Sequence, residues 1–148
     1  MDGEVRVEVT CDADLVPARA EGRAMADRLG FTRTEATLIA TAISEIARNI
    51  VVHVGRGEIV LRPRHEERRW GVTVVASDTG QGIRDVDSAL LDGYASHGGL
   101  GLGLPGARRL MDEFHIATER GEGTVVTMTK WRARDELERL REERRRRG

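Results

Sequence analysis

The sequence of 148 residues contains a single cysteine, Cys11, and no long apolar run. One thiol excludes an intramolecular disulfide and any metal site built from several cysteines, and nothing around Cys11 indicates a nucleophile. No stretch approaches the roughly 20 apolar residues that a membrane span requires. The first residues, MDGEVRVEVT, also lack the basic and then apolar layout of a signal peptide. We therefore expect a cytoplasmic protein without a membrane segment.

An excess of charge of one sign is also missing. The 24 Lys and Arg residues nearly offset the 25 Asp and Glu residues, which leaves a formal net charge of -1. The chain as a whole therefore offers no attraction to nucleic acid or to an anionic membrane, and we expect neither as a partner. The one local basic run, Arg144–Arg147, follows acidic residues, so the C-terminus is mixed in sign.

The N-terminal half reads as one strand and two helices. Valines alternate with charged residues over 4–10 and predict a half-buried strand. Two helices follow, each with a polar capping residue before it and a glycine after it. The caps are Asp12 or Asp14 for the first helix and Thr32 or Thr34 for the second, and the terminating glycines are Gly30 and Gly55.

The C-terminal half reads as four strands and a helix, interrupted by a glycine-rich stretch over 78–103. The expected strands are 57–62 and 70–77, joined by the turn PRHEERR, and a hairpin of 115–119 and 124–131 around RGEG; the helix is 104–114. This order predicts an α+β two-layer sandwich with helices on one face of the sheet. Residues 1–131 would form this domain, and 132–148 a charged tail, either solvated or a partner-binding helix.

Glu45 and Asn49 form the first group with chemical potential. They lie four residues apart on the second helix, about 40° from each other around its axis, beside the buried isoleucine stripe. An amide oxygen is a suitable ligand for Mg²⁺, and a carboxylate can take a proton from an incoming hydroxyl. Taken alone, the pair is more typical of a solvated pair on a helix surface.

A second group, Asp78-Thr-Gly80-Gln-Gly82, directly follows an apolar strand. The carboxylate of Asp78 can accept a hydrogen bond from an exocyclic amine such as that of adenine, and the glycines let the backbone approach a flat ring. A plain turn is the alternative. At the last hairpin, Gly121-x-Gly123-Thr124 is by itself an ordinary turn, but the Thr124 hydroxyl could reach the same purine as Asp78.

A third group is the glycine run over 98–106, which opens a helix. Glycines before a helix N-terminus expose backbone N–H groups that can cradle phosphate. Gly101-x-Gly103-x-x-Gly106 formally matches the dinucleotide-binding fingerprint. That fingerprint requires a strand directly before it, and DGYASHGG is no such strand, so we reject this interpretation.

In this order and on these elements, the motifs resemble the nucleotide-binding boxes of the GHKL ATP-binding superfamily, and most closely those of the RsbT-type switch kinases of the bacterial stressosome. The resembling segments are ISEIARNI, DTGQGI, DGYASHGGLGLGLPGARRLMDEF, GEGT and TKW. The resemblance implies the Bergerat fold, a mixed and mostly antiparallel sheet with helices on one face, and it implies ATP and Mg²⁺ as cofactors.

The resemblance also implies a role for each matching residue. Asn49 would ligate the Mg²⁺ that bridges the ATP phosphates, and Glu45 would be the general base. Asp78 would bind the adenine amino group. The other base-pocket residues would be Gly80, Gly82 and Thr124, and the lid residues that offer backbone to the phosphates would be Gly99, Gly101 and Gly103. His97 is interpreted as a solvated lid residue that could meet phosphate when protonated.

By the same resemblance, the activity would be that of a serine/threonine protein kinase acting on STAS-domain antagonist or scaffold proteins. The kinase, once released from them, would activate a PP2C-type phosphatase. The alternative is an anti-sigma factor with serine kinase activity that binds a sigma factor directly. A sensor histidine kinase fragment and a chaperone-type clamp are disfavoured, because neither a dimerisation helix with a phosphoacceptor histidine nor a transducer domain accompanies the ATP region. The sequence leaves open whether the chain forms a homodimer.

Overall fold

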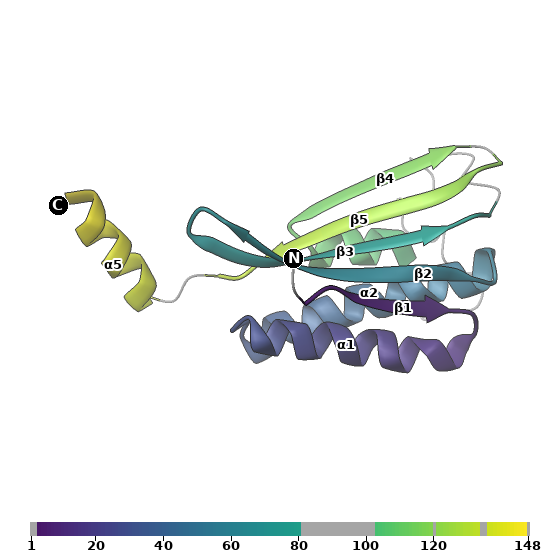
Figure 1. Ribbon diagram of the computed structural model, residues 1–148, viewed down its shortest axis with the longest axis horizontal. Coiled ribbons are helices and arrows are strands. Elements are labelled where there is room, and N and C mark those ends of the chain that lie inside the picture. The colour runs from purple at the N-terminus through teal and green to yellow at the C-terminus, as the bar shows by residue number, and fades with distance from the viewer. Residues whose placement is uncertain (1–2, 81–102, 120, 134–135, 148) are drawn as a thin grey trace.

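Figure 1 shows a five-stranded sheet with helices packed on one of its faces. The computed structural model describes residues 3–80, 103–119, 121–133 and 136–147. In chain order the elements are β1 (Val5–Val9), the 3-10 turn η1 (Asp12–Asp14), α1 (Leu15–Arg28), α2 (Arg33–His53), β2 (Gly57–Glu66), β3 (Arg69–Asp78), α4 (Gly103–Leu110), β4 (Glu113–Glu119), β5 (Gly123–Trp131) and α5 (Glu136–Arg147). The predicted α+β two-layer sandwich is confirmed.

The strands lie in the order β1-β2-β3-β5-β4. Each of the four pairings among the described residues is antiparallel, so this part of the sheet is wholly antiparallel rather than mixed. Because side chains alternate along a strand, one face of the sheet turns toward the described helices, and none of those helices covers the other face. We call the second the helix-free face.

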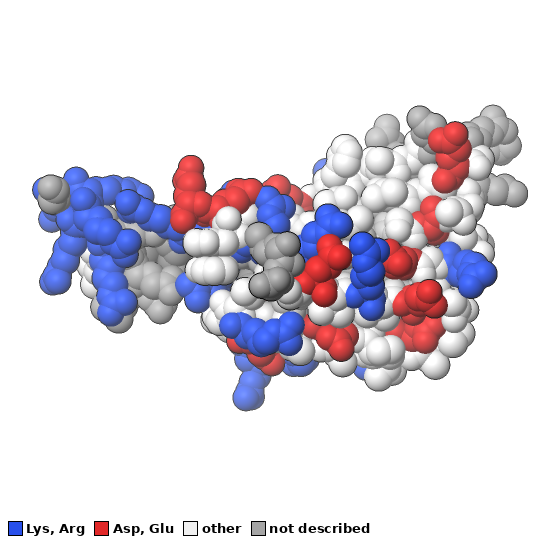
Figure 2. Space-filling model, viewed as in Figure 1, with Lys and Arg blue, Asp and Glu red and all other residues white. Residues whose placement is uncertain are grey.

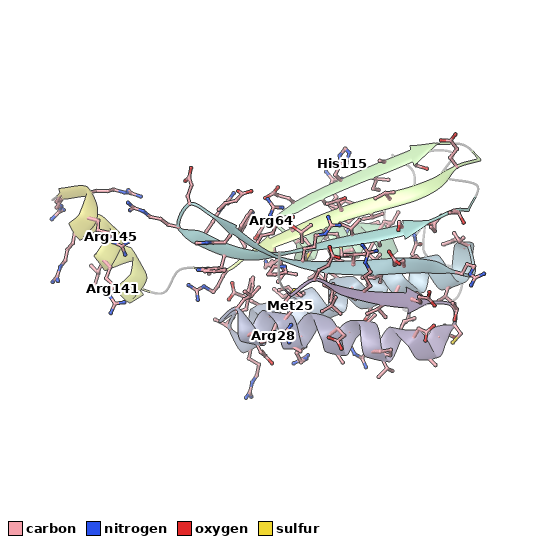
Figure 3. All side chains as sticks on the ribbon, viewed as in Figure 1. Met25, Arg28, Arg64, His115, Arg141 and Arg145 are labelled. Carbon is pink, nitrogen blue, oxygen red and sulfur yellow. The ribbon has the colours of Figure 1, made fainter. Side chains whose placement is uncertain are left out.

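The hydrophobic core lies between the sheet and the helices. Its central part is the predicted stripe of α2, formed by Ile39, Ile43, Ile46 and Ile50, each at most 4% exposed. Helix α2 lies between α1 and α4 (Figure 1) and packs against both. Gly22 permits the close approach of α1, since a Cβ there would lie 2.2 Å from Cδ1 of Ile43. Figure 3 shows Met25 pointing into this layer and Arg28 pointing away from it.

Helix α2 begins at a complete capping box. The Thr32 hydroxyl accepts a hydrogen bond from the Glu35 backbone N–H at 3.1 Å, and Oε1 of Glu35 accepts one from the Thr32 N–H at 2.9 Å. The other carboxylate oxygen, Oε2, accepts a hydrogen bond from the Ala133 N–H at 2.9 Å. One side chain therefore caps the central helix and also attaches the segment that follows β5.

The start of α1 differs from the prediction that an aspartate side chain caps it. Asp14 occupies the N-cap position but makes no capping hydrogen bond with its side chain. Its Oδ2 instead accepts hydrogen bonds from the backbone N–H of Thr10 at 2.7 Å and from its hydroxyl at 2.9 Å. These bonds hold the pKa of Asp14 below its usual value. The carboxylate thus fixes the end of β1 rather than the helix.

The hairpin between β2 and β3 is longer than predicted. Most of PRHEERR, which the sequence suggests is a turn, continues the two strands, and only two residues, Glu67 and Arg68, lie between them. Glu67 takes a positive φ of 51°, as a tight hairpin turn demands. The charged residues of this segment pair with one another, since Glu66 contacts both Arg64 and Arg69.

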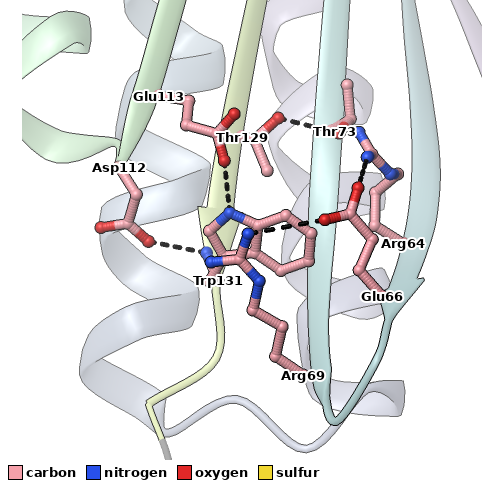
Figure 4. Close-up of polar contacts among 8 residues, drawn as sticks. All are labelled: Arg64, Glu66, Arg69, Thr73, Asp112, Glu113, Thr129 and Trp131. Atoms are coloured by element: carbon pink, nitrogen blue, oxygen red, sulfur yellow. Dashed lines mark hydrogen bonds and ion pairs between the residues drawn. The ribbon is translucent and has the colours of Figure 1, made fainter.

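Trp131 packs near the turn end of this hairpin, on the helix-free face (Figure 4). The Arg69 guanidinium lies over its ring, 3.7 Å from the centroid, and its indole N–H donates to Glu113. A Cβ on Gly71 would lie 2.6 Å from the same ring, so glycine leaves the space that the indole fills. The adjacent Asp112 accepts a hydrogen bond from the backbone N–H of Trp131 at 2.7 Å.

The helix predicted over 104–114 ends early, at Leu110. The reason is Phe114, which pairs with Met128 across β4 and β5 and packs against the core from the sheet. A helix extended to this position would remove that strand residue from the core. Sequence periodicity cannot separate the two alternatives over so few residues.

The C-terminal segment forms a helix, α5, which projects from the domain (Figure 1). Figure 2 shows basic side chains gathered on it, and Figure 3 shows Arg141 and Arg145 directed into solvent. The segment is helical over Glu136–Arg147, and its described side chains are exposed. Among the helices that the structure describes, none has the length and apolar composition needed to cross a bilayer.

Replacing Glu35 by glutamine tests its double role. Glutamine keeps one acceptor oxygen and loses the charge, so we expect E35Q to lower the free energy of unfolding at pH 7 by about 1 kcal/mol. Burial raises the pKa of Glu35, but the hydrogen bonds from Thr32 and Ala133 outweigh it, and the net pKa lies below the usual value.

A group with a lowered folded-state pKa stabilises the fold above its unfolded pKa, and this stability is lost as pH falls through the folded value. The difference between E35Q and the unsubstituted chain should therefore shrink below about pH 4. Urea unfolding across this range measures it, and a difference that stays constant with pH would contradict the assignment.

Candidate functional site

Glu45 and Asn49 lie one turn apart on α2, and both are partly buried. Taking about 100° per residue, they lie about 160° and 120° around the helix from Ile43, whose side chain meets α1. Their side chains therefore point away from the contact that Ile43 makes with α1. Helix α2 also packs against α4. No hydrogen bond engages the Asn49 carboxamide within the described part of the chain.

Asp78 ends β3, the central strand of the sheet. Its Oδ1 accepts a hydrogen bond from the Gly80 N–H at 2.9 Å, which leaves Oδ2 available for a ligand. Gly80 in turn lies against the residue after α2, because a Cβ there would be 2.9 Å from Cγ2 of Val54. The end of β3 and the end of α2 thus meet. Asn49 lies five residues before Val54, about 7.5 Å along the helix.

Thr124 lies directly opposite Asp78 on β5 and is 7% exposed. Each lies two residues from a core residue that faces the helices, Ala76 on β3 and Val126 on β5, so both side chains turn to the helix side of the sheet. The predicted meeting of Asp78 and Thr124 at one place is therefore observed in the structure. Gly123 permits it, since a Cβ there would lie 2.1 Å from the Asp78 carbonyl oxygen, and its φ is +103°.

A third hydroxyl, that of Thr118, continues this line on β4. Thr118 pairs with Thr124, and their Oγ1 atoms are 3.1 Å apart. We call Asp78, Thr124 and Thr118 the polar row. Thr118 was not among the residues predicted from sequence, although its alternation with Phe114 and Ile116 places it on the core side of β4.

The glycine run is described only from its end. Gly103 is the first residue of α4, and the helix it opens is buried against α2 through Leu104 and Ala107. The predicted phosphate-contacting residues Gly99 and Gly101, the base-pocket residue Gly82 and the lid residue His97 lie outside the described residues.

Arg48 is a second residue that sequence reasoning missed. It follows Glu45 by three positions and directly precedes Asn49 on α2. Its Nε is buried and has no hydrogen-bond partner within the described part of the chain. An unpaired buried donor is costly, and a bound anion is one group that would satisfy it.

A hollow of about 330 Å³ lies close by but opens on the other face of the sheet. Its lining includes Glu8, Glu58 and Ser77, which face one another across β1, β2 and β3. They alternate with core residues such as Ile59, so their side chains point to the helix-free face. Asp78 of the polar row also lines this hollow, so the two adjoin at the end of β3, although the Asp78 side chain turns toward the helices.

Comparisons with known proteins agree with this arrangement. The family model described as "Histidine kinase-like ATPase domain" matches residues 7–130. The chain is 41% identical over 131 residues to the serine/threonine-protein kinase RsbT of Bacillus subtilis, covering 88% of this chain and 98% of that protein. It is 31% identical to an anti-sigma F factor of Caldanaerobacter subterraneus subsp. tengcongensis, with 80% of this chain and 85% of that protein covered.

A solved structure shows the same fold. The crystal structure of the RsbU and RsbW domains of Rv1364c from Mycobacterium tuberculosis matches with a TM-score of 0.61 at 20% identity. The match covers 88% of this chain and 33% of that longer one. The predicted resemblance to GHKL proteins and to RsbT-type kinases is thereby confirmed, and ATP is the nucleotide that it implies. The chain belongs to the histidine kinase-like ATPase domain family.

Proposed function

We propose that this chain is a serine/threonine protein kinase that transfers the γ-phosphoryl group of ATP to a STAS-domain antagonist protein in a partner-switching module. When released from that partner, it would activate a PP2C-type phosphatase. The nucleotide-binding part of the proposal is supported by the pairing of Asp78 with Thr124. This pair lies near the end of α2, the helix that carries Asn49. The substrate part is supported by the 41% identity to the kinase RsbT.

The base would lie against the polar row. Oδ2 of Asp78 is available to accept a hydrogen bond from the 6-amino group, because Oδ1 is engaged by Gly80. Gly80 and Gly82 would let the backbone approach the ring, and Thr124 would add its hydroxyl beside Asp78.

The phosphates would extend along the flank of α2 toward the start of α4. Gly103 opens that helix, and its N-terminus together with the backbone of Gly99 and Gly101 would offer N–H groups to them. The Nε of Arg48, buried without a partner in the described residues, fits an anionic group nearby. When bound, Mg²⁺ would neutralise charge on the phosphate oxygens and so lower the barrier to transfer.

The residues fit a magnesium ion held mainly by its nucleotide. Within the described residues no three His, Cys, Asp or Glu side chains gather into a metal cluster, so a metal site built from protein carboxylates alone is not found there. Asn49 offers one hard oxygen ligand, and Mg²⁺ in phosphate-transfer sites typically takes few protein ligands and several phosphate or water oxygens.

Glu45 would act on the attacking group. Its carboxylate lies one turn before Asn49 on the same flank of α2, where it can take the proton of a serine or threonine hydroxyl as the hydroxyl oxygen bonds to the γ-phosphorus. The bond from that phosphorus to the bridging oxygen breaks, and ADP leaves with the electron pair. Asn49 holds the phosphates in position throughout.

The second candidate function is that of an anti-sigma factor with serine kinase activity that binds a sigma factor directly. The observation that favours it is the 31% identity to an anti-sigma F factor over 85% of that protein's length. Both candidates use the same nucleotide site, so they differ in the bound protein rather than in the chemistry.

A phosphotransfer assay tests the proposed activity. The chain is incubated with Mg-ATP and a STAS-domain protein, and mass spectrometry identifies the modified residue. We expect phosphoserine or phosphothreonine on the STAS protein. Phosphohistidine, or free phosphate without any modified protein, would refute the proposal. Pull-down against a sigma factor and against the N-terminal region of a PP2C-type phosphatase then separates the two candidates.

Substitutions on α2 test the division of roles. We expect Asn49→Ala to abolish magnesium-dependent nucleotide binding, because it removes the metal ligand. Glu45→Ala should slow phosphotransfer by about 100-fold or more while leaving nucleotide affinity nearly unchanged, because a general base acts only in the transition state. Calorimetric titration and single-turnover kinetics measure the two effects.

Glu8→Ala is the matched control, since Glu8 is an exposed carboxylate on the helix-free face. It should leave both quantities unchanged. Equal loss of nucleotide binding in Asn49→Ala and Glu45→Ala would mean that the two residues do not have the separate roles proposed.

A further inference from the structure

The polar row crosses three neighbouring strands at one end of the sheet. Thr124 of β5 stands between Asp78 of β3 and Thr118 of β4, and it is directly opposite each in the antiparallel register. Thr124 is 7% exposed and Thr118 is half-buried. In so enclosed a position, a ligand donor or acceptor without a matching partner would lower the binding affinity, because little water is present to replace the lost hydrogen bond.

The two threonine hydroxyls share a short chain of hydrogen bonds. Oγ1 of Thr118 lies 3.3 Å from the carbonyl oxygen of Gly123, and 3.1 Å from Oγ1 of Thr124. A carbonyl oxygen can only accept, so the contact to Gly123 uses the single hydroxyl proton of Thr118. Either hydroxyl could donate in the contact between them, and both contacts form together only when the Thr124 proton makes it and Thr118 accepts.

This direction of donation sets what Thr124 can offer a ligand. With its proton turned to Thr118, the Thr124 oxygen presents only lone pairs toward the side of Asp78. Asp78 is itself an acceptor, through the oxygen that Gly80 leaves available. Two acceptors side by side match an exocyclic amino group, because its two N–H bonds can each donate to one of them, and they oppose a carbonyl oxygen in the same place.

We propose that Thr118 is a positioning residue that fixes the direction of the Thr124 hydroxyl and thereby makes the pocket select 6-amino purines over 6-oxo purines. Thr118 need not touch the base. The inference rests on the proposed function, because it takes the polar row to be where the purine binds.

The test compares the affinities of the chain for ATP and for ITP, which carries a 6-oxo group in place of the 6-amino group. Thr118→Val keeps the shape of the side chain but removes the hydroxyl, so the Thr124 proton loses its acceptor and can turn to the ligand. We expect the ATP/ITP affinity ratio to fall by roughly 3–10-fold, the value of one hydrogen bond. Titration calorimetry measures both affinities.

Three further variants support this experiment. Thr118→Ser retains the hydroxyl and should keep the ratio within about 2-fold of the unsubstituted chain. Thr118→Ala removes the hydroxyl without adding an apolar branch and should lower the ratio as Thr118→Val does. Thr127→Val is the matched control, because Thr127 is a half-buried threonine of β5 that pairs with His115 on the helix-free face, and it should leave the ratio unchanged.

The outcomes separate the inference from the function it rests on. An unchanged ATP/ITP ratio in folded Thr118→Val and Thr118→Ala, with or without a common loss of affinity, would overturn the inference and assign Thr118 a packing role. If the unsubstituted chain binds neither nucleotide, the proposed function itself fails, and this inference fails with it.

Discussion

The packing of the α2 isoleucine stripe against the helix-facing side of the sheet is the contact on which the rest of the structure depends. Ile39, Ile43, Ile46 and Ile50 are all buried, and they fix the rotation of the helix about its own axis. Once that rotation is set, Asn49 and Glu45 must emerge on the flank away from α1, since a helix carries each residue about 100° from the last. The packing of the core therefore sets the geometry of the candidate site, and a substitution in the isoleucine stripe would displace Glu45 and Asn49 together.

The polar row is the point at which the core rows of the sheet become polar. Along β3 and β5 the helix-facing positions run from Val74 and Met128 to Ala76 and Val126, and then to Asp78 and Thr124. The same antiparallel pairing that aligns the apolar residues brings the polar ones together. Rigid strands thus hold the proposed base pocket in place, which favours a preorganised binding site over one assembled by loops.

Much of this fold and part of the site could be predicted from sequence, for local reasons. The capping box at Thr32 and the isoleucine spacing are read within one helix, and the pairing of Asp78 with Thr124 follows from motifs that resemble a known family. The β2–β3 hairpin was underestimated because a run of charged residues next to the turn hides the usual alternation, although residues such as Glu66 and Arg69 pair with each other across the strands. Thr118 was missed for a related reason: a lone hydroxyl in a strand gains meaning only from the register with β5.

The bond between Glu35 and Ala133 bears on how a second protein could reach this domain. Strand β5 runs from Thr124 at the polar row to Trp131, a spacing of seven residues or about 24 Å. The chain then turns to α2 through Ala133 and leaves as α5. Helix α5 is thus attached at the end of the domain opposite the polar row (Figure 1). A protein bound to α5 would leave the end of the domain with the polar row accessible, so that partner binding and catalysis would take place on one molecule at the same time.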